Sequence, residues 1–192
     1  MEQDVQSRVL NLGCGFRHFI GAVNVDAYDN CKPDVVWDLN KTPWEWAKDN
    51  EYDAIFAWHV FEHLSNWFGA LKECSRILKP GGKIEIRVPD ESSSTAGTYR
   101  DHVFVFTQYS FHGIEDGNSM LSSRGGTNAW AVHEQHQIPL KCIHYWQVPY
   151  KGYNWMLHCT WLLKFCARHL RNFIWEQIFI FEKIGEQDGQ GS

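Results

Sequence analysis

The sequence predicts an α/β fold built on a mostly parallel sheet flanked by helices, and three observations support it. Short apolar runs alternate along the first ninety residues with segments of helical or turn character. One of these segments has apolar residues at helical spacing, and glycines or prolines follow several of the runs. The chain has 192 residues, 44% of them apolar and 21% charged, which is the ordinary balance of a globular domain. We therefore expect one domain over residues 1–192.

Five apolar runs are the expected strands of the first half of the chain. Each is short and is bounded by glycine, proline or polar residues, which is typical of buried strands. The runs occupy residues 8–12, 22–26, 34–38, 52–58 and 82–88. A helix is expected between the last two, with one apolar face formed by Trp67, Leu71, Cys74 and Leu78. The Lys-Pro-Gly-Gly sequence at residues 79–82 predicts a turn into the fifth strand.

The connection between the first two expected strands is unusually short. Only nine residues, 13–21, separate them. A crossover between neighbouring parallel strands normally needs about a dozen residues or more. We therefore expect the first helix of the fold to be shortened to about one turn.

The second half of the chain has weaker signals. Residues 91–128 are rich in Ser, Thr, Gly and Asn and predict a long excursion or lid. An extended piece is expected at residues 139–148, and an antiparallel last strand at 173–184. Between them a helix is predicted, with one face formed by Trp155, Cys159, Leu162, Cys166, Leu170 and Phe173.

Charge and composition exclude several classes of protein. The net charge of −5 argues against a protein that coats nucleic acid. No stretch approaches the roughly 18–20 apolar residues that span a bilayer, and no secretory signal is visible at the N-terminus. The six cysteines form no C-x-x-C pair, so we expect reduced, mostly buried thiols and a cytoplasmic location. Residues 117–175 hold six basic residues, one acid and ten aromatics. This composition fits either a helix face beside an aromatic core or a pocket wall for an anionic or aromatic substrate.

A glycine pair and two acids indicate a nucleoside site. Gly13 and Gly15 follow the first strand, where the lack of a Cβ lets a ligand approach backbone N–H groups. Asp26 ends the second strand and can accept hydrogen bonds from a ribose diol, while Asp38 ends the third strand near an adenine. A dinucleotide site fits less well, because the third glycine is missing and the acid follows Gly15 after eleven residues instead of about twenty.

Five motifs follow one another in the first half of the chain: Leu10-Asn-Leu-Gly-Cys-Gly15, Asn24-Val-Asp26, Trp37-Asp38-Leu39, the run from Tyr52 to Leu64, and Arg76-Ile-Leu-Lys-Pro-Gly-Gly-Lys83. In this order they resemble the motifs of class I S-adenosylmethionine-dependent methyltransferases, and most closely those of the type 11 group. The resemblance implies a Rossmann-like fold, with a cofactor-binding half at residues 1–90 and an acceptor or lid half at 91–192. It implies that S-adenosyl-L-methionine is the cofactor. The implied contacts are the methionine moiety with Gly13, Cys14 and Gly15, the ribose with Asp26 and Ala27, the adenine with Asp38 and Leu39, and the sulfonium with Trp58 and His59.

Two departures from the family pattern concern the cofactor. The shortened first helix weakens the helix dipole that can bind a carboxylate, and Arg17 is a candidate to supply that charge. Only seven residues precede the first strand, so we expect any lid over the cofactor to come from the chain after Pro89.

Histidines are the candidate catalytic residues. His59 is the first candidate base, because the resemblance places it beside the methyl donor. His102 is the second, and it lies with Tyr99 and His112 just past the fifth strand, where the acceptor pocket of the family tends to open. A histidine base suits a hydroxyl acceptor, because its ordinary pKa lies near neutral pH.

A metal site is the alternative for one of these histidines. His59, Glu62 and His63 match the H-x-x-E-H pattern, and on a helix they would share one face. A related E-x-x-E-H arrangement binds a divalent ion in some oxygen methyltransferases. We favour no metal, and keep a Mg²⁺- or Zn²⁺-assisted transferase and a hydrolase as alternatives.

The combined prediction is a methyltransferase that acts on oxygen or nitrogen of a small molecule or sugar. The alternatives are a nicotinamide-dependent oxidoreductase, a noncatalytic S-adenosyl-binding module and a nucleic-acid methyltransferase. The net charge argues against a nucleic-acid substrate, and so does the absence of an Asn-Pro-Pro-Tyr-like tetrapeptide after the fourth strand. The expected partner is therefore a small-molecule acceptor, with no membrane association.

Overall fold

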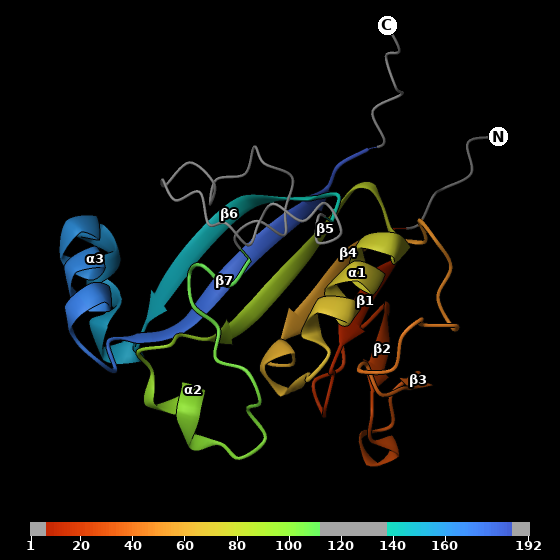
Figure 1. The fold of residues 1–192 in the computed structure, drawn as a ribbon, viewed down its shortest axis with the longest axis horizontal. Coiled ribbons are helices and arrows are strands. Elements are labelled where there is room, and N and C mark those ends of the chain that lie inside the picture. Colours follow the sequence, from red (N-terminus) through yellow and green to blue (C-terminus); the bar gives the residue numbers. More distant parts are fainter. Residues whose placement is uncertain (1–6, 112–137, 186–192) are drawn as a thin grey trace, which may run out of the picture.

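The computed structural model describes residues 7–111 and 138–185. Within that part of the chain seven strands form one sheet, in the order β3-β2-β1-β4-β5-β7-β6 (Figure 1). The strands are β1 (Val9–Leu12), β2 (Ala22–Asp26), β3 (Val35–Val36), β4 (Tyr52–Trp58), β5 (Leu78–Pro89), β6 (Leu140–Pro149) and β7 (Ile174–Lys183). The α-helices are α1 (Trp67–Ile77), α2 (Ser94–Thr98) and α3 (Thr160–His169), and short 3-10 segments are η1 (Asp29–Cys31), η2 (Phe61–His63) and η5 (Lys151–His158).

The strand directions confirm the predicted fold class. β1 pairs in parallel with β2 and β4, β2 with β3, and β4 with β5. β7 runs antiparallel to β5, and β6 antiparallel to β7. The sheet is therefore mostly parallel and the last strand in the chain is antiparallel, as the sequence predicts.

Strand β5 begins earlier than predicted. It starts at Leu78, which pairs with Tyr52, and the pairing then resumes at Lys83 with Ala54. Residues 79–82, predicted as a turn, form an irregular insertion between these two pairs. Gly81 in this insertion has a φ of 76°, a conformation that glycine adopts without steric cost.

Helix α1 lies against one face of the sheet (Figure 1). The Asn66 side chain caps its first turn by accepting a hydrogen bond of 3.3 Å from the Gly69 N–H. The predicted apolar face is present, with Leu71 and Cys74 fully buried. Leu78 is also buried, but as the first residue of β5 rather than the last of the helix.

The crossover between β1 and β2 contains no helix in residues 13–21, all of which the structure describes. In a helix, the N–H and C=O groups of this segment would bond to one another. Here two buried asparagine side chains form hydrogen bonds with some of these backbone groups instead. The Asn11 amide donates to the Arg17 carbonyl and to the Asn24 Oδ1, both at 2.9 Å. The Asn24 Oδ1 also accepts from the Phe19 N–H at 2.9 Å. The Phe19 ring packs edge-on at 5.4 Å from Phe56, so one aromatic side chain covers part of the sheet there.

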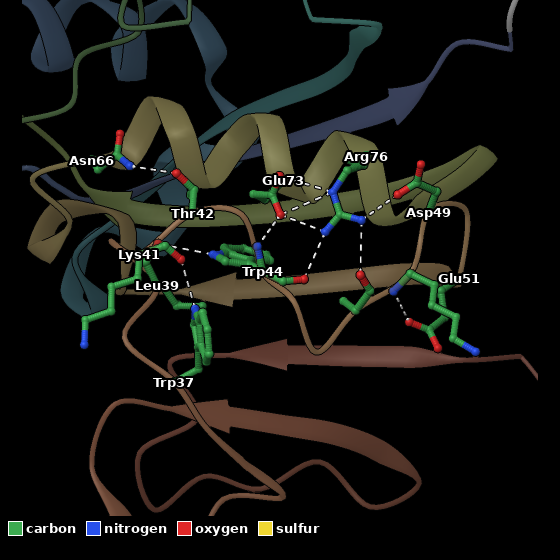
Figure 2. Close-up of polar contacts among 12 residues, drawn as sticks. Trp37, Leu39, Lys41, Thr42, Trp44, Asp49, Glu51, Asn66, Glu73 and Arg76 are labelled. Atoms are coloured by element: carbon green, nitrogen blue, oxygen red, sulfur yellow. Dashed lines mark hydrogen bonds and ion pairs between the residues drawn. The ribbon is translucent and has the colours of Figure 1, made fainter.

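A partly buried ion pair fixes the loop between β3 and β4 to helix α1 (Figure 2). The Glu73 carboxylate accepts from the Trp44 N–H at 2.6 Å and from the Arg76 guanidinium at 2.7 Å. Arg76 also donates to the Trp44 carbonyl and to the Asp49 carboxylate. The Trp44 indole donates to the Leu39 carbonyl at 3.3 Å, so the network reaches the residue that follows Asp38.

The predicted helix over residues 155–173 is wrong in its extent and its burial. Cys159 has φ −129° and ψ 73°, which interrupts the helical backbone between η5 and α3. Trp155 belongs to η5 and is 59% exposed, and Leu170 follows α3 and is 41% exposed. The apolar spacing therefore did not mark a face that packs on the core. Cys166 alone of the predicted face is buried.

Two expectations from composition concern membranes and thiols. No helix within the described ranges has the length and apolar character needed to cross a bilayer. All six cysteines are free, and five of them are buried, as predicted.

Candidate functional site

The glycine turn after β1 is held by the aspartate that ends β2. Gly13 and Gly15 have φ values of 60° and 48°, which favour glycine. The Gly15 N–H donates to the Asp26 Oδ2 at 2.8 Å, and the Cys14 N–H donates to the Val25 carbonyl at 3.0 Å. A Cβ on Gly15 would meet no atom within 4 Å, so space beside this residue is open to a ligand.

The turn also packs against the chain that follows β4. A Cβ on Gly13 would lie only 2.5 Å from the Val60 Cγ2, a distance that real Cβ atoms do not reach. Only glycine therefore fits at position 13. This contact brings the turns after β1 and β4 together at one edge of the sheet.

The two predicted aspartates lie at the ends of neighbouring strands: Asp26 is the last residue of β2, and Asp38 follows the last residue of β3 by two positions. The Trp37 N–H donates to the Asp26 carbonyl at 2.8 Å, which places Asp38 one residue further along the same edge. The Asp26 Oδ1 accepts from the Tyr28 N–H at 3.0 Å, so each of its oxygens already has one backbone donor. Asp38 accepts from the Asn40 N–H and amide at 3.0 Å. Ala27 is exposed beside Asp26, and Leu39 is buried beside Asp38.

Trp58, the last residue of β4, lies near two guanidinium groups. Its indole donates to the Glu85 carboxylate at 2.9 Å, and the Arg87 Cζ lies 4.0 Å from its ring centroid. Arg87 is paired with Glu85 at 2.6 Å. Arg17 lies 5.9 Å from the same ring and has no ion pair or side-chain hydrogen bond within the described residues. Arg17 is therefore the cation that an anionic group of a ligand could pair with.

His59 lies between two carboxylates. Its Nε2 is 2.9 Å from the Glu176 carboxylate and its Nδ1 is 3.3 Å from the Glu62 Oε1. Burial lowers the pKa of His59, but the carboxylates of Glu176 and Glu62 outweigh it and raise the pKa to about 9. A ring that is protonated at neutral pH cannot accept a proton, so this arrangement does not support the predicted role of His59 as base.

Glu176 is a site residue that the sequence reasoning missed. It lies in β7, 117 residues after His59, so no local spacing connects the two. The signal that could have found it is an acid placed with Gln177 between the apolar residues of the expected last strand, because buried acids are rare unless they are paired.

The H-x-x-E-H segment does not form the predicted helix face. Only Phe61–His63 is helical, as a single 3-10 turn, and His59 before it has a φ of 55°. The side chains that come together instead are Glu62, His63 and His102. The rings of His63 and His102 are 4.7 Å apart.

The predicted lid is described up to Phe111. Figure 1 shows the arrowheads of β4 and β5 at one edge of the sheet, with α2 beyond that edge. The segment after α2 is bonded to η2, because the Glu62 carbonyl accepts from the N–H groups of Val103 and Phe104. The remainder of the lid, His112 and the part of the basic stretch at residues 117–137 lie outside the described residues.

Two thiols lie beside the glycine turn. Burial, followed by the Asp26 charge, raises the pKa of Cys14 to about 12, and burial also raises the pKa of Cys31. Both thiols are therefore protonated at neutral pH and are poor nucleophiles. They line the turn without adding charge to it.

The geometry above agrees with a comparison against known families. The profile of a family described as a methyltransferase domain matches residues 2–157. The chain belongs to the methyltransferase domain family. The match includes the glycine turn, both aspartates and the His59–His102 region, whereas Glu176 lies after its end.

Solved structures show that the methyltransferase fold extends over nearly all of the chain. An S-adenosylmethionine-dependent methyltransferase from Archaeoglobus fulgidus is 16% identical, with a TM-score of 0.60 over 92% of this chain and 86% of that one. A methyltransferase from Haloferax volcanii, in complex with the Trm112 activator, is 15% identical, with a TM-score of 0.60 over 98% and 87%. At these identities the likeness establishes the shared fold.

One curated relative of this methyltransferase domain is a polyketide synthase-like protein, Preu9, from Preussia isomera. It is 35% identical over 83 residues, which are 43% of this chain. The match spans 4% of the length of that protein.

Proposed function

We propose that the chain is an S-adenosylmethionine-dependent methyltransferase that methylates an oxygen or nitrogen of a small molecule or sugar. The observation that carries the proposal is the hydrogen bond between Gly15 and Asp26, with Asp38 two residues after the end of the next strand. Parallel α/β sheets bind nucleotides at this edge, outside the carboxyl ends of their strands. The proposal treats residues 1–90 as the cofactor-binding half and 91–192 as the acceptor half of one domain.

The residues at this edge have the chemistry that the cofactor needs. Open space beside Gly15 lets a ligand reach the backbone, and each oxygen of Asp26 keeps a second lone pair for a ribose hydroxyl. The proposed contacts with the cofactor are Gly13, Cys14 and Gly15 for the methionine moiety, Asp26 and Ala27 for the ribose, Asp38 and Leu39 for the adenine, and Trp58 and His59 beside the sulfonium. When bound, the cofactor supplies a methyl group that the acceptor can take by direct displacement.

The acceptor is assigned to the segment that follows β5. His102 keeps its Nε2 free of hydrogen bonds within the described residues, since only its Nδ1 is bonded, to the Ala96 carbonyl at 3.2 Å. Both ring nitrogens of His59 are engaged. The proposal therefore gives contact with the acceptor to His102, and assigns His59 the role of holding Glu62 and Glu176 in place. Alignment of the two reactants contributes to the rate independently of any base.

Calorimetric titration with S-adenosylhomocysteine tests the cofactor assignment. Asp26→Ala removes the carboxylate that would bind the ribose, which costs about 1.5–3 kcal/mol of binding free energy, or roughly 10- to 150-fold in Kd. Asp29→Ala is the matched control, because Asp29 is an exposed acid three residues further along the same loop.

The two variants give a clear decision. Weaker binding by Asp26→Ala, with Asp29→Ala equal to the parent, supports the ribose assignment. Equal affinities for all three proteins would remove it. Circular dichroism of each variant separates lost binding from lost folding, because the Asp26 carboxylate also holds the glycine turn.

A further inference from the structure

Three side chains at the carboxyl end of β4 have the composition of a metal site. Glu62, His63 and His102 each place one potential ligand atom within 4.8 Å of the others. Glu62 and His63 belong to η2, and His102 comes from the segment after α2. A tetrahedral Zn²⁺ with bonds of about 2.0–2.1 Å holds its ligand atoms about 3.4 Å apart, so these side chains would have to close by no more than about 1.4 Å around an ion.

Glu62 is a buried carboxylate without a hydrogen bond. The residue is 1% exposed, and neither carboxylate oxygen has a hydrogen-bond partner within the described residues. Its nearest charge is the His59 Nδ1 at 3.3 Å, in a geometry that is an ion pair and not a hydrogen bond. A buried carboxylate is costly unless a cation or hydrogen-bond donors compensate it. One of its oxygens therefore lacks any compensating group.

Each of the two histidines has its Nδ1 beside a backbone carbonyl, as metal-binding histidines often do. The His63 Nδ1 is 3.0 Å from the Asp101 carbonyl and 3.2 Å from the Asp101 carboxylate. The His102 Nδ1 is 3.2 Å from the Ala96 carbonyl. A ring N–H that donates from Nδ1 leaves the Nε2 lone pair free, and this pairing is the common second-shell arrangement of metal-binding histidines. The His63 side chain is 33% exposed, so an ion can reach the cluster from solvent.

The two segments that carry these side chains, η2 and the segment after α2, are joined by backbone hydrogen bonds. The Glu62 carbonyl accepts from the Val103 N–H at 2.8 Å and from the Phe104 N–H at 3.2 Å. These bonds place His102 beside η2 through the backbone. The cluster therefore does not depend on a chance approach of two exposed side chains.

We propose that Glu62, His63 and His102 bind a divalent transition-metal ion such as Zn²⁺, with His59 outside the coordination sphere. Two imidazoles and one carboxylate are a donor set that holds Zn²⁺ or Fe²⁺ and leaves further positions open. This inference rests on the proposed methyltransferase function and narrows its acceptor to a hydroxyl compound. An alcohol or phenol in an open position would lose its proton to solvent more easily. Its oxygen would then bond to the methyl carbon as the methyl–sulfur bond of the sulfonium breaks, with S-adenosylhomocysteine as the leaving group.

Titration of the metal-stripped full chain with Zn²⁺ tests the site. Parent, His102→Ala and Glu62→Gln are compared with His158→Ala, an exposed histidine at the end of η5. We expect one Zn²⁺ per chain, at least about 100-fold weaker binding for each ligand variant, and parent-like binding for His158→Ala. Asp101→Asn, which alters a group bonded to His63, should weaken binding by about 10-fold.

The outcomes separate this inference from the proposed function. No Zn²⁺ binding by the parent, or equal binding by all variants, would overturn the metal site. His102→Ala is the decisive variant, because it removes one proposed ligand that lies outside the sheet, in the segment after α2. Circular dichroism of this variant shows whether the domain is still folded. S-adenosylhomocysteine binding by the metal-stripped parent is measured in parallel. If this protein does not bind S-adenosylhomocysteine, the result counts against the proposed function and not against the metal site.

Discussion

Replacing Glu73 with glutamine tests the network that holds the loop carrying Asp38 and Leu39. The carboxylate accepts from the Trp44 N–H at 2.6 Å and from Arg76 at 2.7 Å, and its side chain is 11% exposed. Hydrogen bonds to a charged group contribute about 1.5–3 kcal/mol, and removing one partner of a buried ion pair costs about 3–5 kcal/mol. Arg76 keeps its bond to Asp49 and is 28% exposed, so we expect a loss of about 2–3 kcal/mol.

The loss should depend on pH in a defined direction. Burial raises the pKa of Glu73, but hydrogen bonds from Arg76 and from the Trp44 N–H outweigh burial and hold the pKa below its usual value. A carboxyl with a depressed pKa in the folded state stabilises the protein above its unfolded pKa, and this contribution is lost as the pH falls through the folded value. The difference in stability between the parent and Glu73→Gln should therefore shrink in acid.

Urea unfolding followed by tryptophan fluorescence at pH 7 and at stepwise lower pH measures this difference. Glu45→Gln is the control, because Glu45 is exposed and follows Trp44 directly, and it should stay within about 0.5 kcal/mol of the parent. A gap between parent and Glu73→Gln that stays constant from pH 7 into acid would refute the electrostatic reasoning. The same variant should bind S-adenosylhomocysteine more weakly, since Trp44 holds the Leu39 carbonyl.

Two further substitutions test the glycine turn and its surroundings. Arg17→Ala should weaken S-adenosylhomocysteine binding by about two- to five-fold in calorimetry, because an exposed ion pair with the ligand carboxylate is lost; unchanged affinity would reject this role. Gly13→Ala should lower the free energy of unfolding in urea by more than about 2 kcal/mol, because its methyl group would lie 2.5 Å from Val60. Gly21→Ala, which has a φ of 80° but open space, should cost only about 1 kcal/mol, and equal losses would contradict the packing argument.

Local sequence signals were sufficient for the strands of the first half. The runs at residues 22–26 and 52–58 coincide with β2 and β4, because apolar residues bounded by turn residues mark buried strands. The glycine turn and Asp26 could be paired in advance, since parallel strands place their carboxyl ends at one edge. The start of β5 at Leu78 could not, because it depends on pairing with Tyr52 across the sheet.

The chemistry of the acceptor side depended on contacts that no spacing encodes. His59 meets Glu176 from a strand 117 residues away, and that contact helps to raise the pKa of His59. His63 meets His102 through the backbone bonds of the segment after α2. The apolar pattern around Trp155 predicted a buried helix face, yet that side chain is 59% exposed. Periodicity alone does not say whether an apolar face is covered.

The short crossover between β1 and β2 has a consequence for how the domain folds. Asn11 and Asn24, which pair across these strands, are only thirteen positions apart, whereas a unit with a full helix spans about 30 residues or more. Closing the shorter loop saves about 0.7 kcal/mol of chain entropy. This parallel pair is thus as local as a long hairpin, and such low contact order favours early formation. The glycine turn and its aspartate would then meet on the nascent chain before the distant strands β6 and β7 have been made.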